Sequence, residues 1–577
     1  MNTLATNVSR RIGVASPIEG VVYPPIERLQ RYLEAGALTH ESLADGLRAS
    51  FANHADRTAL CGSAGDLTYR QLDDITDRFA AALLALGLRT LDRVIFQFAN
   101  SNELVIGFVA CLKAGLIPVA TLAAHREHEI GYLAGLSGAR AHFVQGDDGK
   151  FDDVAFAQQM RSRVPGLKWI IQARGVARSD AHGMHSMIDA MPLDVARRAL
   201  ANVELDPFQV AVFQLSGGTT GVPKIIPRFN NEYLYNMRAV AQFNGYRADD
   251  VLFMPLPMMH NLNMGCCFGP FLLTGGAVTV ASDLQPASLT AIFQRYLPTW
   301  AVLGGPILEK LRPAIESGQM PVKQLRGVVS STGAPRLRSI LGVPAYHIFG
   351  MTEGVIMMTR DDQPQVVRDS MVGRPVSPHD EVKLFRIGTE EEILEEGVEG
   401  ECAFAGPYTI HGYYRAPERN KETFTRSGFY RSGDLMLFRD IEGQRYYKFC
   451  GRTKDVVDRG GEKINCEEVE GVVSRHPAVA MTSVVGMPDP VFGERVCAFM
   501  VVREGHEAPS VADLGAFLSE VGVAKFKWPE RIEVLDEFPL TKTGKLSKPL
   551  LRQVIVDKLA AERGVAANNH SEARSST

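Results

Sequence analysis

The chain has few of the features expected of a secreted or membrane protein. Its eight cysteines are scattered without a C-x-x-C pair, and the adjacent Cys266 and Cys267 are poorly spaced for a metal site or a disulfide. Residues 1–16 contain no apolar run of the kind found in signal peptides, and the apolar stretch Phe268–Val280 is too short and too interrupted by glycine to cross a bilayer. We therefore expect a cytoplasmic protein with reduced thiols and no membrane partner.

The chain also lacks an excess of charge of either sign. Its 62 lysines and arginines against 66 acidic residues give a formal net charge of -4, which argues against nucleic acid as a partner. With 577 residues, 45% of them hydrophobic and 22% charged, the composition is that of a soluble globular protein with room for several cores. Internal repeats and low-complexity domains are absent from the sequence.

Two common nucleotide-binding signatures are missing from the glycine-rich segment 216–224. Walker A loops need a Gly-Lys-Ser/Thr run, but Val222 and Pro223 separate Gly221 from Lys224 here, and no G-x-G-x-x-G fingerprint occurs in this region. The segment follows an apolar strand at 210–215, and it combines three glycines, three hydroxyl side chains and a lysine, which can bring N–H and O–H donors close to an anion. It is either a flexible turn or a phosphate-binding loop. The loop residues predicted to hold phosphate are Ser216, Gly217, Gly218, Thr219, Thr220, Gly221 and Lys224.

Helical periodicity alternates with short β-rich runs along most of the chain, which favours an α/β fold. Thr68 and Gln71 form a predicted capping box that opens a helix ending at Gly87. The runs Val94–Phe98 and Leu116–Ala120 are predicted strands on either side of a further helix. This β-α-β order predicts parallel strand pairing.

The C-terminal part is predicted to be a separate α+β unit that begins near Gly451–Lys454. We expect residues 1–451 to form an N-terminal core that includes a small β unit at about 385–451, residues 452–560 to form a lid, and residues 561–577 to be a disordered tail. The elements expected in the lid are helices at Glu467–Ser474 and Val511–Glu520 and strands at Val479–Gly486, Arg495–Val502 and Arg531–Val534.

Five segments in a fixed order resemble the core motifs of the adenylate-forming superfamily, which contains acyl-CoA synthetases, nonribosomal peptide adenylation domains and luciferases. The resemblance covers residues from about 25 to 560, and it implies a large N-terminal domain of stacked α/β sheets, a small β unit and a mobile α+β C-terminal domain. The segments are Ser216–Lys224, Phe349–Gly354, Tyr430–Asp434, Gly451–Asp455 with Arg459–Lys463, and Pro539–Lys545.

The same resemblance implies how these residues would act on ATP. Glu353 matches the acid that accompanies Mg²⁺, and Asp434 matches the carboxylate that accepts hydrogen bonds from both ribose hydroxyls. Arg452 would reach ribose or phosphate, and Lys224 and Lys545 would stabilise charge as a carboxylate attacks the α-phosphate. Each of these residues alone has a structural alternative, such as a turn aspartate or a surface arginine. The other residues implied in ATP binding are Gly333, Phe349, Gly350 and Thr352.

The resemblance also implies a site completed by domain closure. Lys545 belongs to the C-terminal unit and the glycine-rich loop to the large one, and family members use one orientation for adenylation and another for thioester formation. Lys454 occupies the hinge position of the family, and Gly460 and Gly461 lie on the loop implied to enter the site in the second orientation.

The segment Pro255–Cys266 indicates which acid is activated, because it contains no acidic residue to pair with a substrate ammonium. Its His260-Asn261 pair resembles the aryl-acid subgroup, in which the asparagine bonds a ring hydroxyl ortho to the carboxylate. The resemblance also aligns Cys266 with a pocket residue that is serine in many dihydroxybenzoate enzymes and cysteine in many salicylate enzymes. This favours salicylate, since a thiol tolerates a bare C–H where a hydroxyl would favour a 3-OH; alternatively, Cys266 is a core cysteine. Leu262 and Ser331 depart from the subgroup, which leaves open a substituted salicylate, a hydroxypicolinate or a hydroxyanthranilate. The residues expected around the acid are His260 (also as a catalytic residue), Asn261, Leu262, Cys266, Ser331, Thr332 and Met351.

The acyl acceptor is expected to be another molecule, because the 32 residues after Lys545 are too few for a carrier domain. The resemblance implies the phosphopantetheine thiol of a separate aryl carrier protein in siderophore or other nonribosomal peptide synthesis. Free coenzyme A, in an aryl-CoA ligase, is the alternative acceptor. A nucleotide-binding regulator that has lost catalysis is the alternative of another class, and Lys224, Glu353, Asp434 and Lys545 together argue against it.

Overall fold

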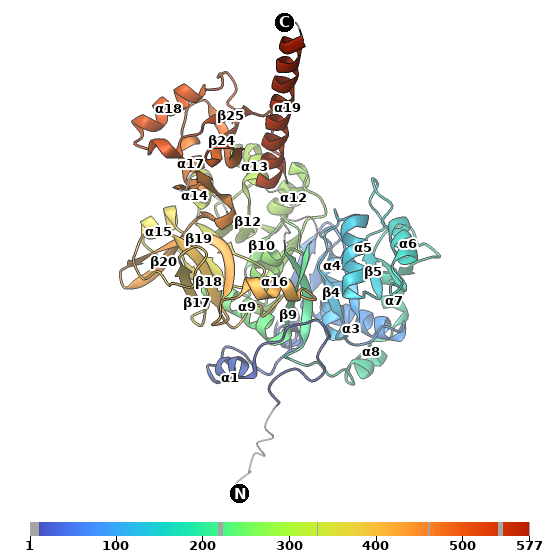
Figure 1. Ribbon diagram of the computed structural model, residues 1–577. Coiled ribbons are helices and arrows are strands. Elements are labelled where there is room, and N and C mark those ends of the chain that lie inside the picture. The colour runs from blue at the N-terminus through green and yellow to red at the C-terminus, as the bar shows by residue number, and fades with distance from the viewer. Residues whose placement is uncertain (1–10, 217–222, 332, 460–461, 541–545, 576–577) are drawn as a thin grey trace. The chain divides into compact units, whose positions relative to one another are not determined.

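The computed structural model describes residues 11–216, 223–331, 333–459, 462–540 and 546–575. The chain divides into two compact units, which are described separately (Figure 1). The first comprises residues 1–382, 404–431 and 441–446, and the second comprises 383–403, 432–440 and 447–577. Parts of the small β unit that we expected in the N-terminal core therefore group with the C-terminal residues.

The first unit contains a seven-stranded sheet in which β3 pairs in parallel with both β4 and β5, as the β-α-β pattern predicts. Helix α3 (Tyr69–Ala85) begins with the expected capping box between Thr68 and Gln71, and α4 (Asn102–Lys113) connects β3 to β4. The strand order is β7 (His182–Gly183), β6 (Trp169–Gln172), β5 (Ala141–Val144), β3 (Arg93–Gln97), β4 (Ile117–Val119), β8 (Val210–Ser216) and β9 (Lys224–Phe229).

A nine-stranded sheet forms the other layer of this unit, and its central strands β14, β13, β12, β10 and β11 are parallel. The strand order is β16 (Arg374–Pro375), β15 (Ile356–Met358), β14 (Ala345–Gly350), β13 (Gly327–Ser330), β12 (Trp300–Val302), β10 (Val251–Phe253), β11 (Ala277–Val280), β1 (Thr58–Gly62) and β2 (Leu67–Thr68). One large hydrophobic cluster contains residues of both sheets, such as Phe96 of β3 and Leu252 of β10, together with Tyr233 of a helix between them.

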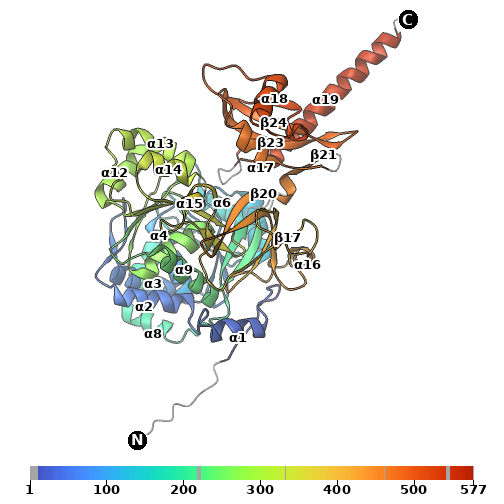
Figure 2. The same ribbon diagram turned by 90° about the vertical axis from the view of Figure 1, so that its left-hand side faces the viewer.

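Helices cover the two sheets of the first unit, and Figure 2 shows α2, α3 and α8 grouped together on it. Helix α9 carries Tyr233 into the shared core. The remaining helices are α1 (Ile26–Glu34), α2 (Leu43–Asn53), α5 (Glu127–Ser137), α6 (Asp153–Arg163), α7 (Met184–Ala190), α8 (Leu193–Leu200), α9 (Asn230–Asn244), α10 (Asn261–Asn263), a π-helical turn (Met264–Phe268), α11 (Gly269–Thr274), α12 (Pro286–Tyr296), α13 (Gly305–Glu316), α14 (Ala334–Leu341), α15 (Gln365–Ser370) and α16 (Pro417–Thr423).

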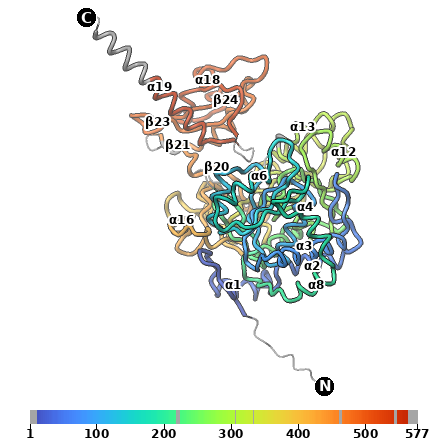
Figure 3. The backbone as a smooth tube through the Cα atoms, turned by 90° about the vertical axis from the view of Figure 1, so that its right-hand side faces the viewer, coloured from blue at the N-terminus to red at the C-terminus, as the bar shows by residue number. Residues whose placement is uncertain are grey.

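The second unit is built on a sheet with the strand order β22 (Glu462–Asn465), β21 (Val456–Arg459), β24 (Gly493–Val502) and β23 (Val479–Asp489), in which β25 (Arg531–Val534) also pairs with β24. Figure 3 labels β21, β23 and β24 of this sheet. Helix α18 (Val511–Glu520) and β25 have the bounds expected from the sequence, and α17 is Cys466–Val473. A further, four-stranded sheet has the strand order β17 (Glu381–Phe385), β18 (Gly400–Ala405), β19 (Tyr430–Ile441) and β20 (Gln444–Arg452).

The C-terminal segment differs from the expected disordered tail. Helix α19 runs from Lys548 to Ser575, through the residues from 561 onward that we expected to be irregular. The alanines of this segment explain the difference, because alanine has the highest helix propensity of all residues.

Candidate active site

The predicted acid-binding and ATP-binding residues of the first unit follow the carboxyl ends of neighbouring parallel strands. Strands β10, β12, β13 and β14 are adjacent and parallel. The segment around His260 follows β10, Ser331 and Gly333 follow β13, and Met351–Glu353 follow β14. This edge is where open α/β sheets bind ligands.

The glycine-rich loop connects two antiparallel strands of the other sheet. Ser216, at the end of β8, lies opposite Lys224 at the start of β9. The side-chain oxygen of Ser216 is buried and has no hydrogen-bond partner within the part of the chain that the structure describes. The predicted phosphate-binding residues Gly217, Gly218, Thr219, Thr220 and Gly221 lie outside the described residues.

Lys224 and Glu353 both contact the side chain of Tyr413. The Nζ atom of Lys224 lies 4.8 Å from the centroid of this ring, and the Tyr413 hydroxyl donates a 2.8 Å hydrogen bond to Oε1 of Glu353. Since the Tyr413 proton is used in that bond, its oxygen accepts the 2.9 Å bond from the Tyr430 hydroxyl. The glutamate is buried, with 7% of its surface exposed. Sequence reasoning missed Tyr413 as a site residue, although it stands in an aromatic pair, Tyr413-Tyr414, that was visible in the sequence.

The environment of Lys224 favours loss of its proton more than water does. Burial lowers the pKa of this lysine, the cation of Arg419 lowers it further, and the carboxylate of Glu353 opposes both effects. An incoming phosphate would supply the negative charge that such a lysine lacks.

The segment after β10 presents an uncharged, buried surface. Asn261 is 7% exposed and Cys266 is 3% exposed. Burial raises the pKa of Cys266 to about 12, so that it is a neutral thiol at physiological pH. The side-chain oxygen of Asn261 accepts a 2.7 Å hydrogen bond from Tyr233. His260 precedes α10, and its Nδ1 atom accepts the backbone N–H of Leu262 at 3.3 Å, which leaves Nε2 as the atom for other contacts.

The residues that follow β13 and β14 are more accessible. Ser331 and Gly333 are exposed, and Gly333 has a φ of 70° immediately before α14, a conformation that favours glycine. Met351 and Thr352 are half-buried. Phe349 and Gly350 end β14, where they pair with β15. Thr332 lies outside the described residues.

Two predicted ATP-binding residues belong to the second unit and contact one another. The Nε atom of Arg452 lies 3.3 Å from Oδ1 of Asp434, whose side chain is 8% exposed. The Thr453 hydroxyl donates a 3.1 Å hydrogen bond to the carbonyl of Gly433, which ties the two motifs together. Burial lowers the pKa of the neighbouring Lys454, and the charge of Arg452 lowers it further. The predicted residues Gly460, Gly461 and Lys545 lie outside the described residues.

Neither a metal cage nor a membrane span appears among the residues that the structure describes. They contain no group of three or more histidine, cysteine or acidic side chains arranged to hold a metal ion. The single buried carboxylate of Glu353 nevertheless fits Mg²⁺, which is commonly held by one or two carboxylates together with substrate phosphates. Within the same described ranges, every helix is too short or too polar to span a bilayer.

Comparison with known proteins identifies the family. The model of the AMP-binding enzyme family matches residues 47–414, and that of the AMP-binding enzyme C-terminal domain matches residues 468–545. The chain belongs to the AMP-binding enzyme family. The expected enzyme class, an AMP-forming ligase, and the expected α/β architecture with a C-terminal domain are thereby confirmed.

Similar proteins cover nearly the whole chain. A Streptomyces protein named salicylyl-CoA synthase / salicylate adenylyltransferase is 36% identical over 94% of this chain and 99% of its own length. The 2,3-dihydroxybenzoate-AMP ligase of Bacillus subtilis is 35% identical over 94% of this chain and 99% of its own length. The apo structure of MbtA from Mycobacterium smegmatis superposes with a TM-score of 0.69 at 30% identity, covering 92% of this chain and 98% of MbtA.

Proposed function

We propose that this protein activates an aromatic 2-hydroxy carboxylic acid with ATP, forming the aryl adenylate and releasing pyrophosphate. The acyl group then passes to the phosphopantetheine thiol of a separate aryl carrier protein, in siderophore or other nonribosomal peptide synthesis. Two observations carry the proposal: Lys224 and Glu353 both contact Tyr413, and the segment around Asn261 is buried and uncharged.

The uncharged segment supports an acid without an amino group. A substrate ammonium would need a carboxylate beside it, because an unpaired charge in a buried site is strongly unfavourable. The buried carboxylate of this region, Glu232, is already neutralised by Arg228 at 2.9 Å. The names of the salicylate and 2,3-dihydroxybenzoate enzymes to which the chain is similar agree with an aromatic hydroxy acid.

The contacts of Lys224 and Glu353 with Tyr413 support attack of the substrate carboxylate on the α-phosphate. Lys224 would attract the phosphates and Glu353 would hold Mg²⁺, which supplies charge neutralisation to the phosphate oxygens when bound. Ser216 would donate its unpartnered hydroxyl to a phosphate. Asp434 would accept hydrogen bonds from the ribose, with Arg452 beside it, and Lys545 would contact the carboxylate and the α-phosphate. Lys454 would be the hinge between the adenylation and thioester steps.

Salicylate is the acid that the buried thiol favours. Cys266 is neutral and nearly inaccessible, so it would fit a ring C–H better than a second hydroxyl. Free coenzyme A remains the second candidate acceptor, since one similar protein is named both as a salicylyl-CoA synthase and as a salicylate adenylyltransferase.

The test is acid-dependent ATP–pyrophosphate exchange with salicylate, 2,3-dihydroxybenzoate, benzoate, hydroxypicolinate, hydroxyanthranilate and amino acids. We expect the strongest exchange with salicylate. Exchange with an amino acid would overturn the assignment of the acid, and no exchange with any acid would overturn the activity. Single-turnover transfer from preformed aryl adenylate to an aryl carrier protein or to coenzyme A would then identify the acceptor.

A further inference from the structure

Arg228 is a buried cation whose contacts reach two segments of the proposed acid-binding region. It lies on β9, and its side chain is 1% exposed. Nε and Nη2 donate to the two carboxylate oxygens of Glu232 at 2.9 and 3.0 Å. Nη1 donates to the Thr352 carbonyl at 3.1 Å and approaches Oδ1 of Asn261 at 3.5 Å. The guanidinium therefore connects the segment after β10 with the segment after β14.

A second set of contacts extends this network toward Cys266. Nη2 of Arg228 also donates to Oδ1 of Asn236 at 3.2 Å, and Nδ2 of Asn236 donates to the carbonyl of Gly265 at 3.0 Å. The guanidinium also lies 4.5 Å from the centre of the Tyr233 ring, and the hydroxyl of that tyrosine donates to Asn261. Arg228 therefore packs against Tyr233, whose hydroxyl is the second hydrogen-bond donor to Asn261.

These contacts determine which way the Asn261 amide faces. An arginine has donors only, so the amide atom beside Nη1 must be the oxygen and cannot be the nitrogen. The Tyr233 hydroxyl converges on the same oxygen at 2.7 Å. With Oδ1 held by two donors, the Nδ2 group is the part of the amide that remains to meet a substrate.

We infer that Arg228 is a positioning residue that makes Asn261 a hydrogen-bond donor, so that the site selects acids with an oxygen ortho to the carboxylate over acids with an ortho amino group. The inference rests on the proposed function. In salicylate the phenol O–H bonds internally to the carboxylate, and the phenol oxygen is free to accept from Nδ2. In anthranilate the amino nitrogen is a poor acceptor, because its lone pair is delocalised into the ring. Benzoate offers nothing at that position.

Replacing Arg228 with lysine tests the inference, because the two side chains differ in the number and direction of their hydrogen-bond donors. A lysine at position 228 has a single charged nitrogen and cannot contact Glu232, Asn236, Asn261 and Thr352 at once. In Arg228→Lys we expect the ratio of kcat/KM for salicylate to that for anthranilate, measured by pyrophosphate exchange, to fall about 10-fold or more, as expected from loss of one directed hydrogen bond. The salicylate-to-benzoate ratio is expected to fall in the same way. Tyr233→Phe, which removes the second donor, is expected to lower both ratios in the same direction.

Arg326→Lys is the matched control. Nη1 of Arg326 donates to both oxygens of Asp250 at 2.5 and 2.6 Å, and Nη2 donates to the carbonyl of Gly245. Neither partner is among the residues after β10, β13 or β14 that we assign to the acid. This variant replaces another arginine that is paired with a buried carboxylate, and we expect unchanged ratios. If Arg228→Lys does not fold, the double variant Arg228→Met with Glu232→Gln carries the comparison, because it removes both charges of the buried pair together.

The outcomes separate the inference from the function on which it rests. A wild-type enzyme that shows no exchange with any aromatic acid overturns the proposed function, and with it the inference. A wild-type enzyme that prefers anthranilate to salicylate keeps the adenylation activity but overturns the inferred orientation of Asn261. Wild-type preference for salicylate with ratios unaltered in Arg228→Lys or its double-variant substitute overturns the role of Arg228 alone.

Discussion

The hydroxyl of Tyr413 donates a hydrogen bond of 2.8 Å to Oε1 of Glu353. The same tyrosine places its ring beside the Nζ atom of Lys224. One side chain therefore orients the carboxylate proposed to hold Mg²⁺ through its hydroxyl and contacts the lysine proposed to bind phosphate through its ring. The two functions of the residue can be separated by mutation.

Tyr413→Phe keeps the ring and removes only the hydroxyl. We expect kcat for pyrophosphate exchange to fall about 10-fold, because a lost hydrogen bond to a charged group is worth about 1.5–3 kcal/mol and Glu353 would be less well oriented. The Mg²⁺ concentration needed for half-maximal exchange should rise. Tyr69→Phe is the control, since Tyr69 is a buried tyrosine that hydrogen-bonds the carbonyl of Gly276 and takes no part in the site. An unchanged magnesium dependence in Tyr413→Phe would contradict the positioning of Glu353 by this hydroxyl.

Cys266→Ser tests the assignment of the thiol to the ring of the acid. A serine hydroxyl is a stronger hydrogen-bonding group than a thiol and would favour a 3-hydroxyl on the substrate. We expect the ratio of kcat/KM for 2,3-dihydroxybenzoate to that for salicylate to rise about 10-fold, the equivalent of one hydrogen bond. Cys267→Ser makes the same chemical change at an adjacent buried thiol and is expected to leave the ratio unaltered. Equal shifts in the two variants would indicate a general packing effect.

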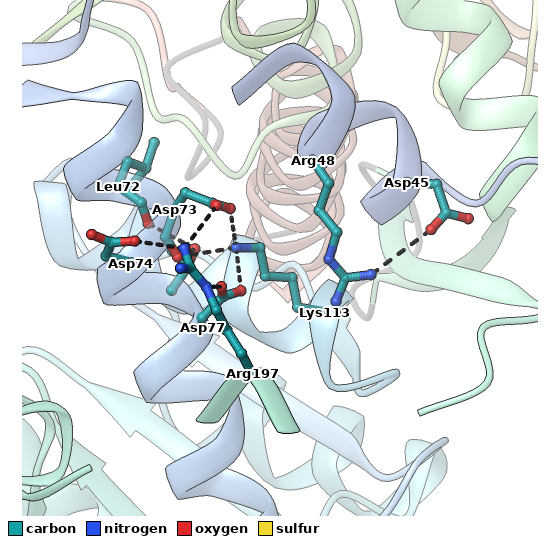
Figure 4. Close-up of polar contacts among 9 residues, drawn as sticks. Asp45, Arg48, Leu72, Asp73, Asp74, Asp77, Lys113 and Arg197 are labelled. Atoms are coloured by element: carbon teal, nitrogen blue, oxygen red, sulfur yellow. Dashed lines mark hydrogen bonds and ion pairs between the residues drawn. The ribbon is translucent and has the colours of Figure 1, made fainter. Parts of the chain in front are cut away.

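Lys113 is a fully buried cation that holds two helices together (Figure 4). It belongs to α4, and its Nζ atom lies 2.6 Å from Asp73 and 2.7 Å from Asp77 of α3. Arg197 of α8 joins the same acidic group, with contacts of 2.7 Å to Asp74 and 3.2 Å to Asp77. The partners of Lys113 and Arg197 in this cluster are not among the residues proposed for the site, and we therefore expect a structural role.

Lys113→Met is expected to lower the free energy of unfolding by about 3 kcal/mol, because Asp77 would be left partly uncompensated in a buried position. Arg48→Met removes the other pair drawn in Figure 4, in which a half-buried Arg48 lies 3.8 Å from the exposed Asp45. That change is expected to cost less than about 1 kcal/mol. Urea unfolding of the two variants gives the comparison, and equal losses would contradict the dependence on burial.

The sequence predicted those helices and strands whose formation depends on residues close together in the chain. The capping box at Thr68 and the strand β25 follow from neighbouring residues, and the structure has both where they were expected. In the segment from residue 561 the polar residues favour disorder and the alanines favour helix, and composition alone does not decide between them. The division of the small β unit depends on contacts between distant segments, which periodicity does not reveal.

The candidate site was predictable only where a motif carried it. Glu353 and Lys224 were proposed from their motifs, but Tyr413, which contacts both, was passed over because a tyrosine has no diagnostic spacing. Arg228 and Glu232 read as an ordinary i, i+4 charge pair in the sequence. Their burial, and the approach of Arg228 to Asn261 across 33 positions of the chain, exist only in the folded structure.

Asp380 is a buried acid whose protonation should make stability depend on pH. Burial raises its pKa to about 8, even though the Tyr408 hydroxyl donates a 2.5 Å hydrogen bond to Oδ2 and opposes the shift. The unfolded chain loses this proton near pH 4. Between about pH 4 and 8 the native state therefore holds more protons than the unfolded state, and its stability falls as pH rises, by up to about 1.4 kcal/mol per pH unit from this group.

Asp380→Asn removes that titration and keeps an acceptor for Tyr408. We expect the stability of the wild type relative to this variant to decrease from pH 5 to pH 8 and then to level off, as measured by urea unfolding at each pH. The sign is decisive, because a carboxylate stabilised by ion pairing would give the opposite trend, with the wild type gaining on the variant as pH rises from acid. Parallel pH profiles for the two proteins would mean that Asp380 ionises at its ordinary value in the folded state.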